Sequence, residues 1–400
     1  MPVSFRAPLW LRILISLALG VAAGVLLGER AVVLKPFGEL FLRLMRMLVT
    51  PVVFVMVVSA IVSTGDLRRL GAVGVRTALW FLVMMALAVT LGLGLGLIMR
   101  PGGAVHLGGA APLPPPAEST LSEQWLAIVP LNPVDALARG DLPPIMLFAA
   151  LLGIGAVAAG ESGRPIATLF QSAMEVLIKM IGLILQTAPL GVFALTAWTV
   201  GAHGFLLFGA MLKLGLAVLI GALIQVLLVH VGLAGLGGLA PLRFLRGIAS
   251  PMLLGFATTS SSATLPASLT AAEINLGLGE RIAPIVLPLG VVIGKSGAAM
   301  FMGLMVVFAV QALGVSVSPA QYGLLGAAAL AMAMSTPSIP SGTLFILPAV
   351  LHIAGIPDVQ AGLVVAMVLP FDRPMDMIRS VPNVTGGLAV AALVAKAEPR

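Results

Sequence analysis

Apolar stretches of about the length that crosses a bilayer follow one another along almost the whole sequence. A spanning helix needs about 20 apolar residues. Only 9% of the 400 residues are charged, whereas about a quarter are charged in a typical soluble protein. We therefore predict an all-α polytopic membrane protein. Its eight expected transmembrane segments are 9–27, 40–63, 77–99, 145–159, 166–200, 205–231, 282–313 and 359–395.

The charge balance and the absence of cysteine limit the expected partners. The net charge of +7 is carried by basic residues that are scattered through apolar stretches, which favours cytoplasmic anchoring of helix ends over nucleic-acid binding. The Pro/Ala/Gly-rich stretch 102–122 has no Lys or Arg and is expected outside. Without cysteine the chain has no disulfides or thiolate metal sites. We expect a lipid bilayer as its surroundings, no nucleic acid, no metal and no cofactor.

Two apolar stretches have polar centres that a lone spanning helix would not tolerate. Residues 244–276 contain the run 258–262 of Thr and Ser, and residues 324–353 contain Thr, Ser and two prolines between 336 and 343. Backbone of this kind is tolerated at membrane depth only inside protein or along a cavity. We predict two re-entrant helical hairpins, with kinked spanning helices as the alternative. Each hairpin precedes a long helix, which suggests inverted repeats with a binding site at the hairpin tips.

A cluster of charges near the C-terminus is the strongest candidate site. Asp372, Asp376, Arg379 and Asn383 follow one another at helical spacing and share one face, with Arg373 about 100° away. Intramembrane charges are costly and usually functional, although an internal ladder of ion pairs is the alternative. Arginine suits a carboxylate and aspartate suits an ammonium group. The pattern therefore predicts an acidic amino acid as substrate.

Several motifs, in order along nearly the whole chain, resemble those of the glutamate/aspartate transporters, the dicarboxylate/amino acid:cation symporter family. The motifs are Thr259 to Pro266, Leu287 to Gly290, Asp372-Arg373, Asn383 to Gly386 and Val394 to Lys396. The resemblance implies a homotrimer in which a scaffold, mainly residues 1–240, supports a moving transport domain by an elevator mechanism. It assigns to the transport domain residues 74–100, part of 205–232, and the core 241–400, with hairpins 244–276 and 324–353 and helices 282–313 and 359–396.

The resemblance also implies roles for single residues. Arg379 would hold the substrate side-chain carboxylate, Asp376 its amino group, and Asn383 its main-chain carboxylate together with the first hairpin. Arg373 would replace an arginine that relatives carry in that hairpin, where this chain has Thr259. The complete expected substrate site is Ser260, Ser261, Ser262, Asp372, Arg373, Asp376, Arg379, Ser380 and Asn383. The expected extracellular gate is Ser338, Ile339, Pro340, Ser341, Gly342 and Thr343.

The chain departs from the family where relatives bind sodium. The family's Asn-Met-Asp-Gly-Thr motif is replaced by residues 294–298, and an aspartate of the last helix by a glycine. A hard cation needs several oxygen ligands, and these changes together remove them. The positions at which we expect lost sodium ligands are Phe81, Met84, Met85, Gly294, Ser296, Ala298 and Gly387.

Lys295 is the new cation at this place. Arg373, Arg379 and Lys295 oppose two aspartates, a net charge of +1. By resemblance, a sodium-coupled relative reaches the same total with about three bound sodium ions. An acidic amino acid would neutralise either site, and a buried site penalises other totals. We hypothesise that Lys295 replaces bound sodium, the alternative being a merely structural lysine. Transport would then be sodium-independent, by uniport or with proton coupling.

Other functions are kept as alternatives. The four scattered histidines and the lack of a metal constellation argue against an enzyme. The rivals are a C4-dicarboxylate carrier, a sodium-coupled symporter with unrecognised ligands, and an anion-conducting channel. The family and the composition indicate a bacterial inner membrane.

Overall fold

The computed structural model describes residues 9–63, 67–105, 129–203, 206–278, 282–334, 336, 342–353 and 356–397. Regular structure in these residues is entirely helical, which confirms the predicted all-α class. The helices are α1 (Leu9–Leu27), α2 (Lys35–Met47), α3 (Val49–Ser63), α4 (Leu67–Met99), α6 (Pro133–Arg139), α7 (Leu142–Ala158), α8 (Arg164–Leu185), α9 (Ala188–His203), α10 (Leu206–Ile224), α11 (Val231–Leu236), α12 (Pro241–Gly247), α13 (Ala249–Thr258), α14 (Ser261–Thr270), α15 (Ala283–Ile293), α16 (Ser296–Ala312), α17 (Pro319–Met334), α18 (Gly342–Ile353) and α19 (Asp358–Ala397).

Six helical segments within the described residues are long and apolar enough to cross a membrane. Other predicted spans are represented by shorter apolar helices such as Thr50–Ser59 and Pro144–Ala158. The membrane class is thus supported, whereas the count of eight spans stays a prediction.

Besides the predicted span 282–313, which a break at Gly294 and Lys295 divides into α15 and α16, two stretches predicted as single spans are each divided in two. Residues 40–63 fall into α2 and α3, and residues 166–200 into α8 and α9. Pro51 lies in the first turn of α3 and Pro189 in the first turn of α9. Proline disrupts a helix interior but fits the first turn, where its missing N–H is not needed. The breaks therefore occur just before these prolines.

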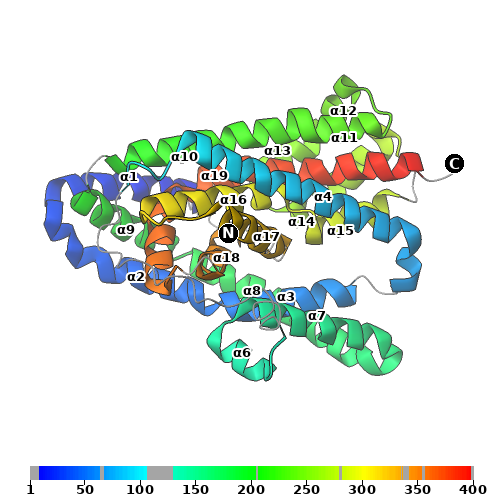
Figure 1. Ribbon diagram of the computed structural model, residues 1–400, viewed down its shortest axis with the longest axis horizontal. Helices are drawn as coiled ribbons and strands as arrows, with labels where there is room; N and C mark the ends of the chain where they lie inside the picture. Colours follow the sequence, from blue (N-terminus) through cyan, green and yellow to red (C-terminus); the bar gives the residue numbers. More distant parts are fainter. Residues whose placement is uncertain are drawn as a thin grey trace, which may run out of the picture.

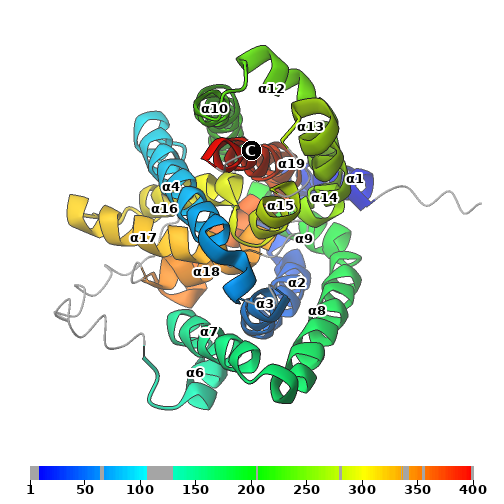
Figure 2. The ribbon, with the colours of Figure 1, turned by 90° about the vertical axis from the view of Figure 1, so that its right-hand side faces the viewer.

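The last helix, α19, lies at the centre of one half of the molecule. It contacts α10, α11, α13, α14, α15, α16 and α18, and the view along the bundle shows α10, α13, α14 and α15 around it (Figure 2). On the other side, α3 packs against α7 and α8, and α1 packs against α9 (Figure 1). Side chains on α19 are therefore held among helices from widely separated parts of the sequence.

Helix α16 is buried on all sides and packs closely along α4. Glycines permit this approach: a Cβ on Gly96 would lie 2.7 Å from Val307 Cβ, and one on Gly303 would lie 2.6 Å from the Val89 carbonyl oxygen. Small residues that let backbones approach are typical of helix contacts in membranes. The α4–α16 pair forms a firm support beside α19.

Each predicted hairpin contains two helices that contact each other. In the first, α13 and α14 are joined at Thr259 and Ser260, with short helix α12 before them and a π-helical turn, Ala271–Leu276, after them. In the second, α17 contacts α18 and begins at Pro319, five residues before the predicted 324. Proline at the first helical position explains this earlier start. The re-entrant position of the hairpins in the bilayer and the division into domains stay predictions.

Candidate functional site

The charged face of α19 forms a buried ion-pair cluster. Arg379 Nη1 donates to Asp372 Oδ1 at 2.8 Å, and its Nη2 lies 2.9 Å from Asp376 Oδ1, although that N–H is not aligned for a hydrogen bond. Arg379 is only 1% exposed, and its guanidinium carbon lies 4.0 Å from the centre of the Phe301 ring on α16. Buried charges persist where they are paired, and an arginine over an aromatic face gains cation–π attraction.

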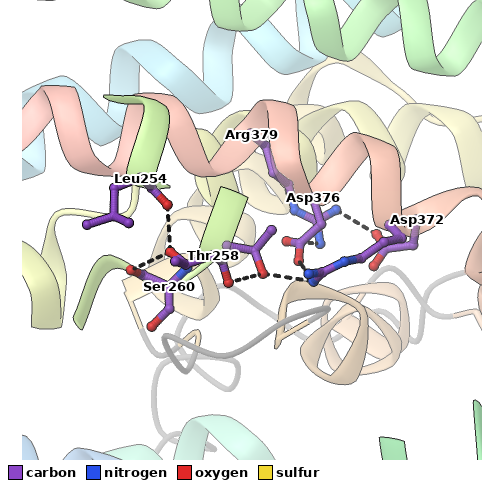
Figure 3. A network of polar contacts seen from close by, with 8 residues as sticks. Leu254, Thr258, Ser260, Asp372, Asp376 and Arg379 are labelled. Carbon is purple, nitrogen blue, oxygen red and sulfur yellow. Dashed lines mark hydrogen bonds and ion pairs between the residues drawn. The ribbon is translucent and has the colours of Figure 1, made fainter. Parts of the chain in front are cut away.

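Arg373 connects this cluster to the tip of the first hairpin. Its Nη1 donates to Thr259 Oγ1 at 2.8 Å and lies 3.8 Å from Asp376 Oδ2. Dashed contacts join Leu254, Thr258 and Ser260 to one another (Figure 3). From Thr258 the network continues through Thr259 and Arg373 to Asp376. The tip and the charged face therefore belong to one polar network.

Among the predicted serines, Ser260 caps α14. Its hydroxyl oxygen accepts from the Ala263 N–H at 3.3 Å, which satisfies one amide of the first turn. Ser261 is buried and Ser262 is exposed at this helix N-terminus, and amides at such an end favour anions.

Lys295 lies at a break between α15 and α16. Gly294 centres an inverse γ-turn, in which the Lys295 N–H donates to the Ile293 carbonyl at 3.0 Å. Lys295 is 2% exposed and stands directly after the C-terminal end of α15. Because Lys295 is also the N-cap of α16, the partial negative charge at the end of α15 and the partial positive charge at the start of α16 meet at this residue.

Asn383 secures the start of α16 against α19. Its Oδ1 accepts from the Gly297 N–H at 2.8 Å and from the Ala298 N–H at 3.2 Å, while Ser296 Oγ donates to the Pro382 carbonyl at 3.1 Å. A side chain on Gly297 would collide with the Arg379 carbonyl. The carbonyl oxygen of Asn383 is thus engaged with α16, and its role toward a substrate stays a prediction.

Hydrocarbon occupies the surroundings of the break where sodium ligands were expected. The ring of Phe81 lies against Gly290 and Gly294, where added Cβ atoms would come within 2.8 and 2.6 Å of it. Met84 packs in the same way against Gly386, and Met85 is fully buried. Aromatic carbons and thioethers are poor ligands for a hard cation, so these described residues do not fit a sodium ion.

The remaining predicted positions fall in several places. Ser380 and Gly387 are buried on α19. Gly387 comes directly after Gly386, the glycine against which Met84 packs. Gly342 and Thr343 begin α18 and are buried. The other expected gate residues, Ser338 to Ser341, lie outside the described residues.

His230 is a buried residue outside the predicted site. It ends a π-helical turn, Gln225–His230, and its Nδ1 lies 2.9 Å from Thr385 Oγ1 on α19. The Thr385 hydroxyl also lies 3.1 Å from the Val381 carbonyl, and when it donates there, Nδ1 carries the proton that joins His230 to Thr385. Nε2 has no hydrogen-bond partner among the described residues. A lone histidine in an apolar stretch carries no pattern that predicts such a contact.

Paired charges buried beside a broken helix, among helices long enough to span a membrane, are typical of membrane transporters. The chain belongs to the Sodium:dicarboxylate symporter family, whose profile matches residues 9–397. It is a transporter and not an enzyme.

Curated relatives cover nearly the whole chain. It is 31% identical to the "Proton/glutamate-aspartate symporter" of Bacillus subtilis, over 97% of this chain and 94% of the relative. It is 30% identical to the "Proton/sodium-glutamate symport protein" of the same organism, over 97% and 92% of the two chains. It is also 30% identical to the "C4-dicarboxylate transport protein" of Solibacter usitatus, over 98% and 92%.

Proposed function

We propose that this protein transports acidic amino acids, aspartate or glutamate, without sodium, and that the ammonium group of Lys295 acts as a tethered replacement for a bound cation. The observation that carries the proposal is the burial of Lys295, which is 2% exposed at the break between the C-terminal end of α15 and the start of α16. In transporters with broken helices, such ends coordinate the coupling cation. A lysine there supplies the positive charge from within the chain.

The charges of the site support an anionic substrate. Arg373 and Arg379 balance Asp372 and Asp376, and Lys295 adds one positive charge. A substrate of charge −1 brings the net charge of the site to zero, and a poorly solvated site favours a net charge of zero. The Phe81 ring fills the space at the break and Met84 packs against Gly386 of α19, and these side chains, which lack oxygen, support sodium independence.

Asp376 supports an amino acid in particular. In the described structure its Oδ1 pairs with Arg379. A substrate carboxylate that takes Arg379 would remove the 2.9 Å ion pair at Asp376 Oδ1, while Oδ2 keeps Arg373 Nη1 at 3.8 Å, and a new cation beside Oδ1 would restore the shorter pair. An amino acid brings that cation as its ammonium group. The proposed substrate residues are those of the predicted site on α14 and α19, with the second hairpin as gate.

The proposal extends to the assembly and its setting. We place the protein in a bacterial inner membrane as a homotrimer, in which residues 241–400 with α4 and part of α10 move against the other helices. The cysteine-free sequence makes such movement open to site-specific labelling.

Uptake of labelled aspartate into proteoliposomes tests the proposal. We expect saturable uptake that is unchanged when sodium replaces potassium or choline, together with counterflow of labelled substrate. An imposed pH gradient then separates uniport from proton coupling, because only the coupled carrier accumulates substrate along the proton gradient. Strong dependence of affinity on sodium would contradict the role of Lys295, and absence of counterflow would indicate a channel.

A C4-dicarboxylate is the second candidate substrate, because one relative is named for such transport. Competition between labelled aspartate and unlabelled succinate decides between them. We expect aspartate to compete at much lower concentration than succinate, since succinate leaves Asp376 without an ammonium partner.

A further inference from the structure

The tip of the first hairpin contains a threonine in a conformation that threonine rarely adopts. Thr259 has φ +54° and ψ +27°, in the left-handed region. For a β-branched residue this conformation is a genuine outlier, because its side chain crowds the backbone. Such outliers persist only where neighbouring contacts enforce them, and they gather at binding sites and switches.

The hydroxyl group of Thr259 makes the contacts that enforce it. It accepts from Arg373 Nη1 at 2.8 Å and donates to the Thr258 carbonyl at 2.7 Å. Thr259 is 5% exposed, and both hydrogen bonds are at least partly shielded from solvent. A buried donor that loses its partner loses more than the value of one bond. The guanidinium of Arg373 therefore fixes the tip from the side of α19.

The left-handed turn determines how the following helix begins. It lets Ser260 adopt the extended conformation, φ −135° and ψ +110°, from which its hydroxyl caps α14. The left-handed turn at Thr259 thereby sets the direction of the first amide N–H groups of α14, those of Ser261 and Ser262. These are the residues through which the hairpin is proposed to bind a substrate carboxylate.

The same Arg373 nitrogen that holds Thr259 also lies 3.8 Å from Asp376 Oδ2. We infer that Thr259 is a positioning residue for transport: Arg373 holds it in the left-handed turn, and the pair transmits the state of Asp376 to the hairpin tip. This inference rests on the proposed substrate site. It assigns a function to Thr259, which is uncharged and is not among the residues proposed to bind substrate.

Substitutions at Thr259 test this role by transport kinetics in proteoliposomes. Thr259→Ser keeps the hydroxyl, and we expect its KM to stay within about twofold of the original. Thr259→Val keeps the shape but removes the hydroxyl, and we expect a KM about tenfold higher with a smaller change in Vmax. Thr270→Val is the matched control, because the Thr270 hydroxyl only bonds the Pro266 carbonyl of its own helix and is exposed. It should leave KM unchanged.

Three further measurements distinguish positioning from simple damage. Thr259→Gly removes the hydroxyl but relieves the backbone, so KM should rise while thermal stability is kept. Ala263→Cys is a single cysteine in the chain, and its labelling by a maleimide should accelerate when Thr259→Val is added. With Arg373→Gln as background, Thr259→Val should have little additional effect on KM or labelling.

The inference is overturned if Thr259→Ser is as impaired as Thr259→Val, or if Thr259→Val leaves KM and labelling unchanged. It is also overturned if the effects of Thr259→Val and Arg373→Gln simply add. These ratios are measured against the unsubstituted protein under identical ions. A sodium requirement would therefore overturn the proposed role of Lys295 without deciding that of Thr259.

Discussion

At the scale of residues, the site is governed by the cost of buried charge. Arg379 is almost fully buried and lies against two carboxylates and an aromatic ring. Removing one member of such a cluster leaves an uncompensated charge, which is far more costly than losing an exposed ion pair. Lys295 differs from Arg373 and Arg379 because it does not belong to α19 and lies at a helix break. Its positive charge is therefore the one that a bound ion could supply instead.

Replacing Lys295 with methionine tests the tethered cation. We expect Lys295→Met to weaken aspartate binding at least about tenfold, because the empty site then carries no surplus positive charge to attract an acidic substrate. Sodium should not restore it, since the hydrocarbon of Phe81 and Met84 remains. Binding measured by calorimetry on purified protein, with and without sodium, provides the check.

Lys213→Met is the matched control for this variant, because Lys213 is exposed on α10. It should bind aspartate like the original protein. Unchanged affinity in Lys295→Met would show that Lys295 is merely structural.

At the scale of elements, the break between α15 and α16 is the decisive feature. The helix stops at Gly294 and restarts after Lys295, with Asn383 capping the new start. Unwound backbone is tolerated here because it is buried in protein and its amides have partners. α4 contributes the Phe81 ring that fills the space beside the break.

Substitutions of Phe81 distinguish a packing role of its ring from a role in binding an ion. Phe81→Ala should lower the free energy of unfolding by about 3–5 kcal/mol, because Phe81 is fully buried and the ring leaves a cavity. Phe81→Tyr restores one oxygen, yet we expect no sodium dependence, since a hard cation needs several such ligands. Thermal unfolding in detergent with and without sodium measures both effects. A sodium-dependent rise in Tm for Phe81→Tyr would contradict the lost-site interpretation.

At the scale of the whole molecule, α19 is joined to helices that are distant in sequence. The His230–Thr385 contact ties the π-helical turn after α10 to α19, and Gln311 of α16 bonds the Gly96 carbonyl of α4 at 3.0 Å. Interhelical hydrogen bonds of this kind fix helices against one another in lipid. These contacts support the proposal that α4, α10, α16 and α19 move as one unit.

Disulfide cross-links test that unit in a chain that has no native cysteine. Cysteine pairs at facing positions of α4 and α16 should leave transport intact after oxidation, because both helices belong to the proposed moving unit. Pairs between α9 and α19, which also contact each other, should block transport and recover on reduction. Full transport by oxidised α9–α19 pairs would rule out the proposed division.

The sequence by itself determined the solvent, the helical class, the family and the charged face of α19. Apolar length reports the bilayer, and spacings of three and four along one helix place Asp372, Asp376 and Arg379 together without knowledge of any other element. These are local properties, and local pattern is sufficient for them. The prolines that mark the breaks before α3 and α9 are present in the sequence, but the continuous apolar stretches around them led to the prediction of unbroken helices.

Only the tertiary structure decided which distant segments meet this face. It placed Asn383 on the amides of α16, Phe81 in the bend at Gly294, Arg373 on a left-handed Thr259, and His230 on Thr385. Each contact joins residues that are tens to hundreds of positions apart, so no periodicity encodes it. The physical reason is that buried polar groups must find partners wherever packing brings them, and packing is a property of the assembled helices.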